Sequence, residues 1–518
     1  MVLNSTVNKC VAIPRAALQG LQVNNFLDIL KSPIFNYLTI PILNLSAIAL
    51  TLQREASQPL FVQLCDQIRA RIVSGQIGGE QPLPASRNLA AELAISRSTV
   101  VTAYDQLVAE GYIEGRRGSG YFVRELAGTD HPGRGTNPAL TETKTLVPAG
   151  GSPLTHPGYP DSRLFPYRQW ARSLARSARV APQAMIVSDS PFGDPHLRQS
   201  IANYLADWRG LDIQPQQVMV TAGSVDALET CIRTLTSRGD LVGLENPGYR
   251  PLRNLIKNQG MRIEWLGVGA NGADLPRKPA TRLAVVTPSQ QFPLGGAMPA
   301  NRRREYQQWA NNNDAWIIED DYDSEFRYAG RPIPALASLD ASERTIYVGT
   351  FSKVFSVSLR LAYLIMPAAL IGEFRQTLSR FGVKAALPCQ RALSDFIDSG
   401  DFYRHIRRVR RIYADRRKLL LELLQQKLSQ HVSFQDHQAG MQVCALLAPG
   451  LDDQAIAELA LARGVQVSPL SSHYGGGDVQ QGLLLGFCCF DESEISTNID
   501  VLSDIIKAQA RGPGSSAG

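Results

Sequence analysis

Lys353 is the residue whose position points most directly to chemistry. It follows the apolar run Thr345–Val348, which has the composition of a buried strand, and Arg360 stands seven residues further on. Functional side chains of open α/β sheets collect at the carboxyl ends of their strands. A lysine held there can form a Schiff base with an aldehyde cofactor. A lone lysine is usually a surface residue, so this interpretation depends on its neighbours.

The acidic run Glu319–Asp323 follows another predicted strand, Trp316–Ile318. One of its carboxylates could keep a pyridinium nitrogen protonated, and Tyr322 could donate a hydrogen bond to a phenolic oxygen of the same ring. The alternative interpretation is an acidic loop in solvent. The two interpretations differ in where these carboxylates lie.

Two further segments suit a flat, phosphorylated cofactor. Thr221–Val225 opens a predicted helix after the strand-like run Val218–Thr221, and free amides at a helix start cradle a phosphate. Tyr249 follows the turn Asn246–Gly248 and could stack on a flat ring. Neither pattern is specific by itself. Each supports a cofactor site only in combination with Lys353.

Residues 54–124 have the pattern of three helices followed by a hairpin. Apolar residues recur at helical spacing, and Ser96 is placed to cap the third helix by accepting a free amide. The predicted elements are helices from Pro59 to near Gly75, from Leu83 onward and from Ser96 to Gly111, and strands over Tyr112–Glu114 and Tyr121–Val123. This order predicts a winged helix-turn-helix.

The residue types of this segment suit double-stranded DNA. The third predicted helix starts with Arg97, Ser98 and Thr99, donors that fit a groove beside phosphates, and a Gly-rich hairpin tip carries Arg116 and Arg117. Residues 54–124 hold eight Arg and seven acids, a net charge of +1. A few well-placed arginines must therefore do the binding. A three-helix protein-interaction module is the alternative.

This segment resembles the GntR family of winged-helix regulators. The similarity lies in the runs Leu83–Ala90 and Ser96–Val100, the pair Ala103-Tyr104, and Gly118–Gly120 with Phe122-Val123. The resemblance implies that six residues contact an operator: Arg87, Ser96, Arg97, Thr99, Arg117 and Gly118. The residue types alone add Ser98 and Arg116 to this set.

Residues from about 150 to 505 resemble fold-type I, class I aminotransferases, which use pyridoxal 5′-phosphate. The resemblance implies that Lys353 carries the cofactor as a Schiff base, Asp320 pairs with the pyridine nitrogen, Tyr322 bonds the 3′ oxygen and Tyr249 stacks on the ring. It also implies a set of residues that hold the phosphate: Gly223, Ser224, the amide of Val225, Ser352 and Arg360.

The order of winged helix, linker and aminotransferase-like domain resembles the MocR/GabR/PdxR subfamily of GntR regulators. Further subfamily-like runs are Pro160-Asp161, Leu164–Pro166, Gln291–Pro293 and Leu483–Phe487. The resemblance implies a homodimer with the site between subunits and with head-to-tail exchange of the DNA-binding domains. It leaves two effectors open: pyridoxal phosphate itself, or an amine or amino acid that forms an aldimine at Lys353.

Several residues depart from the family pattern. Phe192 stands where a tyrosine reaches the partner subunit's phosphate, and the loop before Leu197-Arg198 is short. Substitutions at other family positions are Gln290, Leu294 and Val357-Ser358. Aminotransferases grip the substrate carboxylate with an arginine near the last strand, but Gln481–Cys488 has none, and His473 is the nearest upstream basic side chain beyond Arg463. Without that clamp, efficient transamination is not expected.

Composition excludes a fibrous or wholly disordered chain. Of 518 residues, 44% are hydrophobic and 19% charged, and 53 basic residues against 47 acids give a net charge of +6.

Seven cysteines without C-x-x-C spacing indicate free thiols in a reducing cytoplasm and no metal site. Residues 404–418 hold eight basic side chains and one acid, which suits either a second DNA contact or a solvated helix face.

The predicted fold is α/β: a small winged helix-turn-helix domain linked to a large aminotransferase-like domain with a mainly parallel sheet. The expected segments are an extension over 1–50, a DNA-binding domain over 54–124, a flexible linker over 125–150, the cofactor-binding domain over 151–508 and a disordered tail over 509–518. The uncharged stretch Ser32–Gln53 makes a membrane anchor the alternative to a dispensable extension or a mis-set start codon.

These patterns predict a cytoplasmic transcription regulator whose operator binding responds to a ligand at Lys353. A working aminotransferase with an attached DNA-binding module is the main alternative. A third interpretation is a regulator that has lost the cofactor and acts through protein contacts, which the change at Phe192 motivates.

Overall fold

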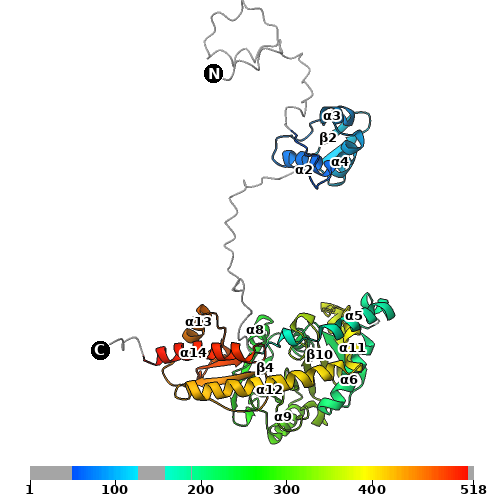
Figure 1. Cartoon of the computed structure of the whole chain (residues 1–518). Helices are drawn as coiled ribbons and strands as arrows, with labels where there is room; N and C mark the ends of the chain where they lie inside the picture. Colours follow the sequence, from blue (N-terminus) through cyan, green and yellow to red (C-terminus); the bar gives the residue numbers. More distant parts are fainter. Residues whose placement is uncertain (1–49, 126–157, 188–189, 512–518) are drawn as a thin grey trace, which may run out of the picture. The chain divides into compact units, whose positions relative to one another are not determined.

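The computed structural model describes residues 50–125, 158–187 and 190–511. The chain divides into two compact units, Met1–Thr143 and Lys144–Gly518, which we describe separately (Figure 1). Residues 1–49 of the predicted extension, all but the first residue of the predicted linker and residues 512–518 lie outside the described part. Among the described residues, no helix is long and apolar enough to cross a membrane.

The first unit contains three helices and a two-stranded hairpin. Its elements are α2 (Leu60–Val73), α3 (Ser86–Glu92), α4 (Arg97–Ala109), β1 (Ile113–Arg116) and β2 (Gly120–Val123). The second helix begins at Ser86 rather than at Leu83, because the amide of Leu83 donates to the carbonyl of Tyr121 and Pro82 bridges to Phe122. The residues before α3 are therefore held by the wing.

Most apolar residues predicted to face inward form the core of this unit, but Val108, predicted to lie on the apolar stripe of the third helix, is 39% exposed. Leu64, Ile68, Leu89 and Val100 are fully buried in one cluster. Ser96 caps α4, since its side chain accepts a hydrogen bond from the amide of Thr99, as predicted. The first unit is a winged helix-turn-helix.

The second unit is built on an eight-stranded sheet with the order β3-β10-β9-β8-β7-β4-β5-β6. Strands β9, β8, β7, β4 and β5 run parallel, whereas β10 is antiparallel to both of its neighbours, β3 and β9. The strands are β3 (Val218–Thr221), β4 (Leu241–Asn246), β5 (Arg262–Gly269), β6 (Gly272–Ala273), β7 (Thr281–Val286), β8 (Trp316–Asp321), β9 (Thr345–Thr350) and β10 (Ala362–Ile365). This confirms the mainly parallel sheet.

A second, antiparallel sheet with the order β11-β12-β14-β13 follows later in the chain. Its strands are β11 (Val432–Phe434), β12 (Gln442–Leu447), β13 (Ser468–Pro469) and β14 (Gly482–Gly486). In Figure 1, α13 and α14 lie at the end of the unit that carries this sheet, and α5, α6 and α11 gather at the other end.

Helices surround both sheets. They are α5 (Tyr167–Val180), α6 (Pro195–Arg209), α7 (Ser224–Leu235), α8 (Arg250–Asn258), α9 (Ala300–Asn312), α10 (Ile371–Phe381), α11 (Gln390–Asp398), α12 (Asp401–Leu428), α13 (Asp453–Ala462) and α14 (Glu492–Arg511). Short 3₁₀ turns include η6 (Ser162–Leu164), η7 (Pro182–Met185), η8 (Pro215–Gln217), η9 (Ala337–Leu339), η10 (Val357–Leu359), η11 (Ala368–Leu370) and η12 (Leu470–His473). Because α14 runs to Arg511, the expected boundary at residue 508 falls inside a helix.

The sheet topology brings distant segments to one edge. Since β3 and β9 are both antiparallel to β10, β3 points the same way as the parallel strands. The carboxyl ends of β3, β4, β7, β8 and β9 therefore share one edge of the sheet. The segments after residues 221, 246, 286, 321 and 350 meet there.

Candidate functional site

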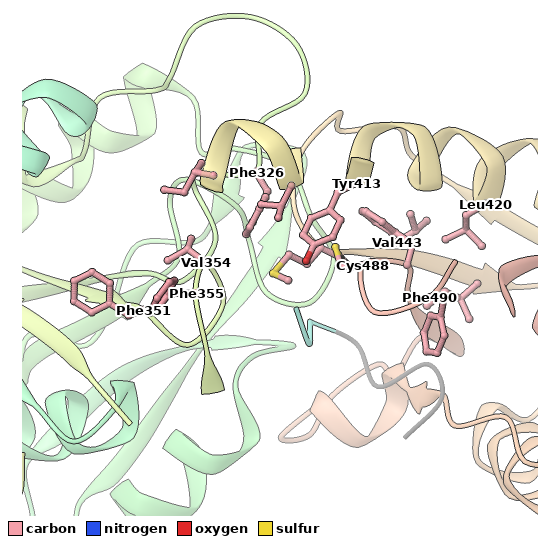
Figure 2. Packing of buried hydrophobic residues seen from close by; sticks show 14 of the residues in the cluster. Phe326, Phe351, Val354, Phe355, Tyr413, Leu420, Val443, Cys488 and Phe490 are labelled. Carbon is pink, nitrogen blue, oxygen red and sulfur yellow. Dashed lines mark hydrogen bonds between the residues drawn. The ribbon is translucent and has the colours of Figure 1, made fainter. Parts of the chain in front are cut away.

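Lys353 lies in a segment that is anchored by buried aromatic and aliphatic side chains. It follows β9, and Phe351, Val354 and Phe355 around it are each at most 3% exposed. Figure 2 shows these three side chains among the packed core residues. Because its neighbours are fixed in this way, Lys353 has little freedom to move away from the sheet edge.

The amine of Lys353 is held by a glycine carbonyl. Its Nζ donates a hydrogen bond to the carbonyl oxygen of Gly158 at 2.8 Å. A Cβ at residue 158 would lie 2.7 Å from Nζ, so only glycine permits this approach. Burial lowers the pKa of Lys353, which Asp323, Cys488 and Asp320 oppose. A lowered pKa increases the fraction of neutral, nucleophilic amine.

Asp320 is a buried carboxyl for which the described residues supply no side-chain hydrogen-bond donor. Burial raises its pKa to about 7, Asp321 and Glu245 add to the rise, and Lys353 opposes it. A protonated ring nitrogen would supply the missing donor and would favour the ionised carboxylate. The residue thus fits the role that the resemblance implies for it.

Asp321 and Glu319 of this run have partners in the protein. Arg209 pairs with Asp321 at 2.9 Å, and Glu319 accepts hydrogen bonds from the amides of Leu336 and Ala337, each at 2.9 Å. Glu319–Asp321 belong to β8 and do not follow it, which corrects the predicted end of this strand. All four acids of the run are at most 9% exposed, so the alternative of an acidic loop in solvent is wrong.

Aromatic side chains cluster beside Asp320. Phe292 makes edge-to-face contacts with Tyr249, Tyr322 and His473, with ring centroids 5.9, 5.8 and 5.1 Å apart. The pKa of Tyr249 is raised to about 12 by burial and by Asp320. Burial raises the pKa of Tyr322 well above its usual range, so its hydroxyl keeps its proton. Both phenols are therefore donors, and Phe292 sets the angle between them.

Sequence reasoning did not assign roles to Phe292 or Gly158. Phe292 was noticed only within a subfamily-like run, and its contacts with both tyrosines show why it matters. Gly158 had no sequence signal. His473 does not replace the missing arginine, because burial lowers its pKa to about 4 and keeps the ring neutral.

A cradle for an anion lies at the start of α7. Gly223 caps the helix with a φ of +109°, and the guanidinium carbon of Arg360 lies 3.6 Å from where its Cβ would be. Arg360 has no ion-pair partner within the described ranges. Free first-turn amides together with an unpaired guanidinium fit a phosphate.

The remaining predicted members of the cradle are placed less directly. Ser224 begins α7 half-buried, and Val225 is 38% exposed in its first turn. The amide of Ser352 donates to the hydroxyl of Thr350 at 3.1 Å, directly before Lys353. The acid in this turn, Asp226, pairs with Lys384 at 3.1 Å, which offsets its charge near the cradle. Lysine, carboxyl, phenols and cradle together fit a phosphorylated pyridine aldehyde.

The place of the expected carboxylate clamp is apolar. Leu483, Leu484 and Leu485 of β14 are each at most 3% exposed. Nearby arginines have other partners: Arg416 bonds Asp161 at 3.0 Å, and Arg417 pairs with Asp436. Phe192 is 2% exposed in a core cluster, so its ring serves packing. The described residues show no arginine free for a substrate carboxylate on β14.

The first unit brings the predicted DNA-facing residues to one end of α4. The hydroxyl of Ser96 lies 2.7 Å from that of Ser98 and 2.8 Å from that of Thr99. Arg97 is exposed, with its Nε 3.4 Å from the hydroxyl of Ser86. Exposed residues also include Arg87 on α3 and Arg117 and Gly118 at the hairpin turn.

Arg116 differs from the other predicted DNA-facing arginines. It pairs with Glu80 and Glu114, each at 2.7 Å, and lies over the ring of Phe122. Its guanidinium is therefore held by the wing itself. The net charge of residues 54–124 does not reveal this pairing, because the sequence does not show which acids neutralise which arginines.

The basic run 404–418 is not one solvated face. Arg416 and Arg417 are buried, and Arg410 donates to the carbonyl of Glu325 at 2.9 Å. Arg404 pairs with Asp401 at 2.8 Å. The members that remain exposed without such a close partner are Arg407, Arg408, Arg411 and Lys418.

Comparisons with known proteins match both units. Residues 60–123 match the family described as bacterial regulatory proteins, gntR family, and residues 159–480 match aminotransferase class I and II. A crystal structure of an archaeal alanine:glyoxylate aminotransferase superposes with a TM-score of 0.64 and 25% identity, covering 70% of this chain and 92% of that one. The fold and the matched families define a helix-turn-helix regulator with an aminotransferase-like domain.

Full-length relatives share this arrangement. The probable rhizopine catabolism regulatory protein MocR of Rhizobium meliloti is 38% identical over 467 residues, which are 88% of this chain and 95% of that protein. The pyridoxine biosynthesis transcriptional regulator PdxR of Corynebacterium glutamicum is 35% identical, with 86% and 95% covered. The chain belongs to the MocR/GabR/PdxR subfamily of GntR-type transcriptional regulators.

Proposed function

We propose that this regulator binds pyridoxal 5′-phosphate at Lys353 and that the bound cofactor, alone or with an amine, changes its affinity for a double-stranded operator. The observation that carries the proposal is the meeting of a buried lysine, a carboxyl without a donor and an anion cradle at one sheet edge. When bound, the cofactor supplies an aldehyde carbon with which a primary amine condenses, with loss of water.

The residues of this chain then have separate tasks. Lys353 offers its amine, whose neutral fraction burial increases and which the carbonyl of Gly158 orients. Asp320, as a carboxylate, would accept a hydrogen bond from the protonated ring nitrogen, Tyr322 would donate to the ring oxygen, and Tyr249 would pack on the ring. Gly223, Ser224, Val225, Ser352 and Arg360 bind the phosphate. Binding spread over so many groups gives the cofactor one orientation.

We propose sensing rather than turnover as the role of this site. The strand that would carry a carboxylate-binding arginine presents buried leucines. An amine can therefore react without being held for repeated transamination. The alternative, an active aminotransferase, predicts conversion of the bound cofactor to its amine form by amino acids.

Operator binding is proposed for the first unit. Arg87, Ser96, Arg97, Ser98, Thr99, Arg117 and Gly118 are the proposed contacts. We further propose a homodimer with head-to-tail exchange of these units, a linker over 125–150 and action in the cytoplasm beside the operator. A ligand shifts such a regulator only if it binds the two conformations unequally.

The first experiment is an absorbance spectrum of the purified full-length protein with added pyridoxal phosphate, beside Lys353→Ala. A visible band in the wild type that is missing in the variant is expected. Circular dichroism of both proteins controls for folding. A band that persists in Lys353→Ala, or no band in either protein, would refute the cofactor assignment.

A further inference from the structure

A cavity of about 560 Å³ opens beside the Lys353 segment. This volume lies in the usual range for small-molecule sites. Its lining includes five aromatic residues, Tyr159, Phe165, Tyr167, Phe355 and Phe490. Phe165 contacts both Tyr167 and Phe355, with ring centroids 4.9 and 4.8 Å apart. The walls are therefore braced against each other and suit an apolar or aromatic group.

Three chain segments that border Lys353 also form this cavity. Tyr159 follows Gly158, whose carbonyl holds the amine of Lys353. Phe355 comes two residues after Lys353, and Cys489 follows Cys488, which acts electrostatically on Lys353. Lys353 does not line the cavity itself, but the cavity wall lies within one or two residues of the groups that surround its amine.

The cavity has a cation in its lining, but that cation is already neutralised. Arg163 pairs with Asp161 at 2.9 Å, Glu494 at 3.1 Å and Asp491 at 3.4 Å. It also donates to the carbonyl of Cys489 at 2.9 Å. Even with Arg416, which shares Asp161, two guanidinium groups face three carboxylates. The excess of negative charge disfavours a ligand carboxylate.

We propose that this cavity binds the side chain of the effector, and that the effector is a primary amine with an apolar or aromatic side chain and no carboxylate. This inference rests on the proposed function, because it places the amine at Lys353. It adds the class of effector and the place where its side chain is recognised.

The position of the cavity in the chain connects recognition with regulation. Residues 159–163 line it, and they lie at the start of the described part of the second unit. A side chain packed against Tyr159 would stabilise one arrangement of this first part of the unit. Differential stabilisation of that kind is what linkage to operator binding requires.

The test titrates the full-length protein, loaded with pyridoxal phosphate, with three probes. Phenethylamine has the proposed side chain, ethylamine lacks it, and phenylalanine adds a carboxylate. The visible spectrum reports binding, and operator affinity is measured in parallel. We expect phenethylamine to bind at least about tenfold more tightly than either other probe, since filling an apolar pocket gives that much discrimination.

Two variants sharpen the assignment. Tyr167→Ala removes an exposed wall residue and should weaken phenethylamine while leaving ethylamine unchanged; Leu339→Ala, another exposed apolar residue outside the lining, is the matched control. The double variant Asp491→Asn/Glu494→Gln removes two of the three carboxylates that pair with Arg163 and should improve binding of phenylalanine. Asn and Gln keep the hydrogen bonds that these residues make at the start of α14.

The outcomes separate this inference from the proposed function. Equal binding of ethylamine and phenethylamine, or tighter binding of phenylalanine by the wild type, would overturn the inference while a Lys353-dependent band persists. Absence of that band would overturn both. An unchanged preference in Tyr167→Ala together with unchanged phenylalanine binding in the double variant would contradict the assignment to this cavity.

Discussion

Polar groups differ between two regions of the second unit. One is the cofactor side, around Lys353, Asp320 and Arg360; the other is the carboxylate side, around β14, Arg163 and Arg416. Among the described residues, the cofactor side gives Asp320 no hydrogen-bond donor and Arg360 no ion-pair partner. The carboxylate side has leucines on β14, and Arg163 and Arg416 are bound to acids. Unpaired groups cost stability unless a ligand satisfies them, so the difference shows which half is arranged for binding.

The comparison indicates how an aminotransferase-like fold can serve a regulator. Cofactor binding needs the sheet edge, and that edge brings Lys353, Asp320 and the cradle at Gly223 together. Turnover needs a second clamp for the substrate, and that clamp is absent from the described strand β14. The site is therefore suited to recognise an amine and to respond to it.

The largest expected effect on the cofactor side comes from Asp320→Asn. Loss of a charge-assisted hydrogen bond to the ring nitrogen should weaken pyridoxal phosphate binding by about ten- to a hundredfold. Titration followed by visible absorbance measures this. Asp321→Asn is not a suitable control, because Arg209 pairs with it; Asp274→Asn changes an acid outside the site. Equal affinity of Asp320→Asn and wild type for pyridoxal phosphate would show that the unpaired Asp320 does not serve cofactor binding.

A comparison of two neighbouring wing arginines follows next in size. Arg117→Ala should weaken operator binding and lower the salt dependence by about one counterion, because Arg117 is free to meet a phosphate. Arg116→Ala should change the salt dependence less, since Glu80 and Glu114 already hold Arg116. Operator titrations at several salt concentrations check both. A larger salt effect from Arg116→Ala would reverse this assignment.

Ser96→Ala should cost about 1 kcal/mol of unfolding free energy in the first unit. The reason is the lost cap of α4, where the hydroxyl of Ser96 accepts from the amide of Thr99 at 3.1 Å. Ser119→Ala in the exposed hairpin turn is the control. Urea denaturation measures the difference, and equal stability of the two variants would show that the cap contributes nothing.

A smaller effect concerns pH. The pKa of Asp320 in the folded protein is raised to about 7, so between its ordinary pKa and 7 the folded state holds more protons than the unfolded state. Unfolding free energy of the cofactor-free protein should therefore fall as pH rises across that interval. Asp320→Asn should flatten this slope. A steeper slope in the variant would contradict the burial argument.

Sequence reasoning was most successful where strands are buried on both faces. The apolar runs at β3, β7, β8 and β9 are strands, and their carboxyl ends located Lys353 and Asp320. The acids at the end of β8 were placed outside the strand, because solvation is the ordinary fate of such residues and their partner Arg209 lies far away in sequence.

Other features depend on tertiary contacts and left no local pattern. The second sheet consists of short strands separated by helices, and its pairing of β11, β12, β14 and β13 was not predicted. The role of Gly158 depends on a contact with Lys353 across 195 residues. Partners distant in the chain cannot be assigned from one sequence, and the pairs of Arg116 with Glu80 and of Arg163 with Glu494 are further examples.

The most direct test of the central claim is a titration of operator DNA with the full-length protein, with and without pyridoxal phosphate, in wild type and Lys353→Ala. We predict that pyridoxal phosphate, alone or with phenethylamine, changes operator affinity of the wild type and leaves Lys353→Ala unaffected. The same affinity under all conditions, or the same response in both proteins, would contradict a regulator controlled through Lys353.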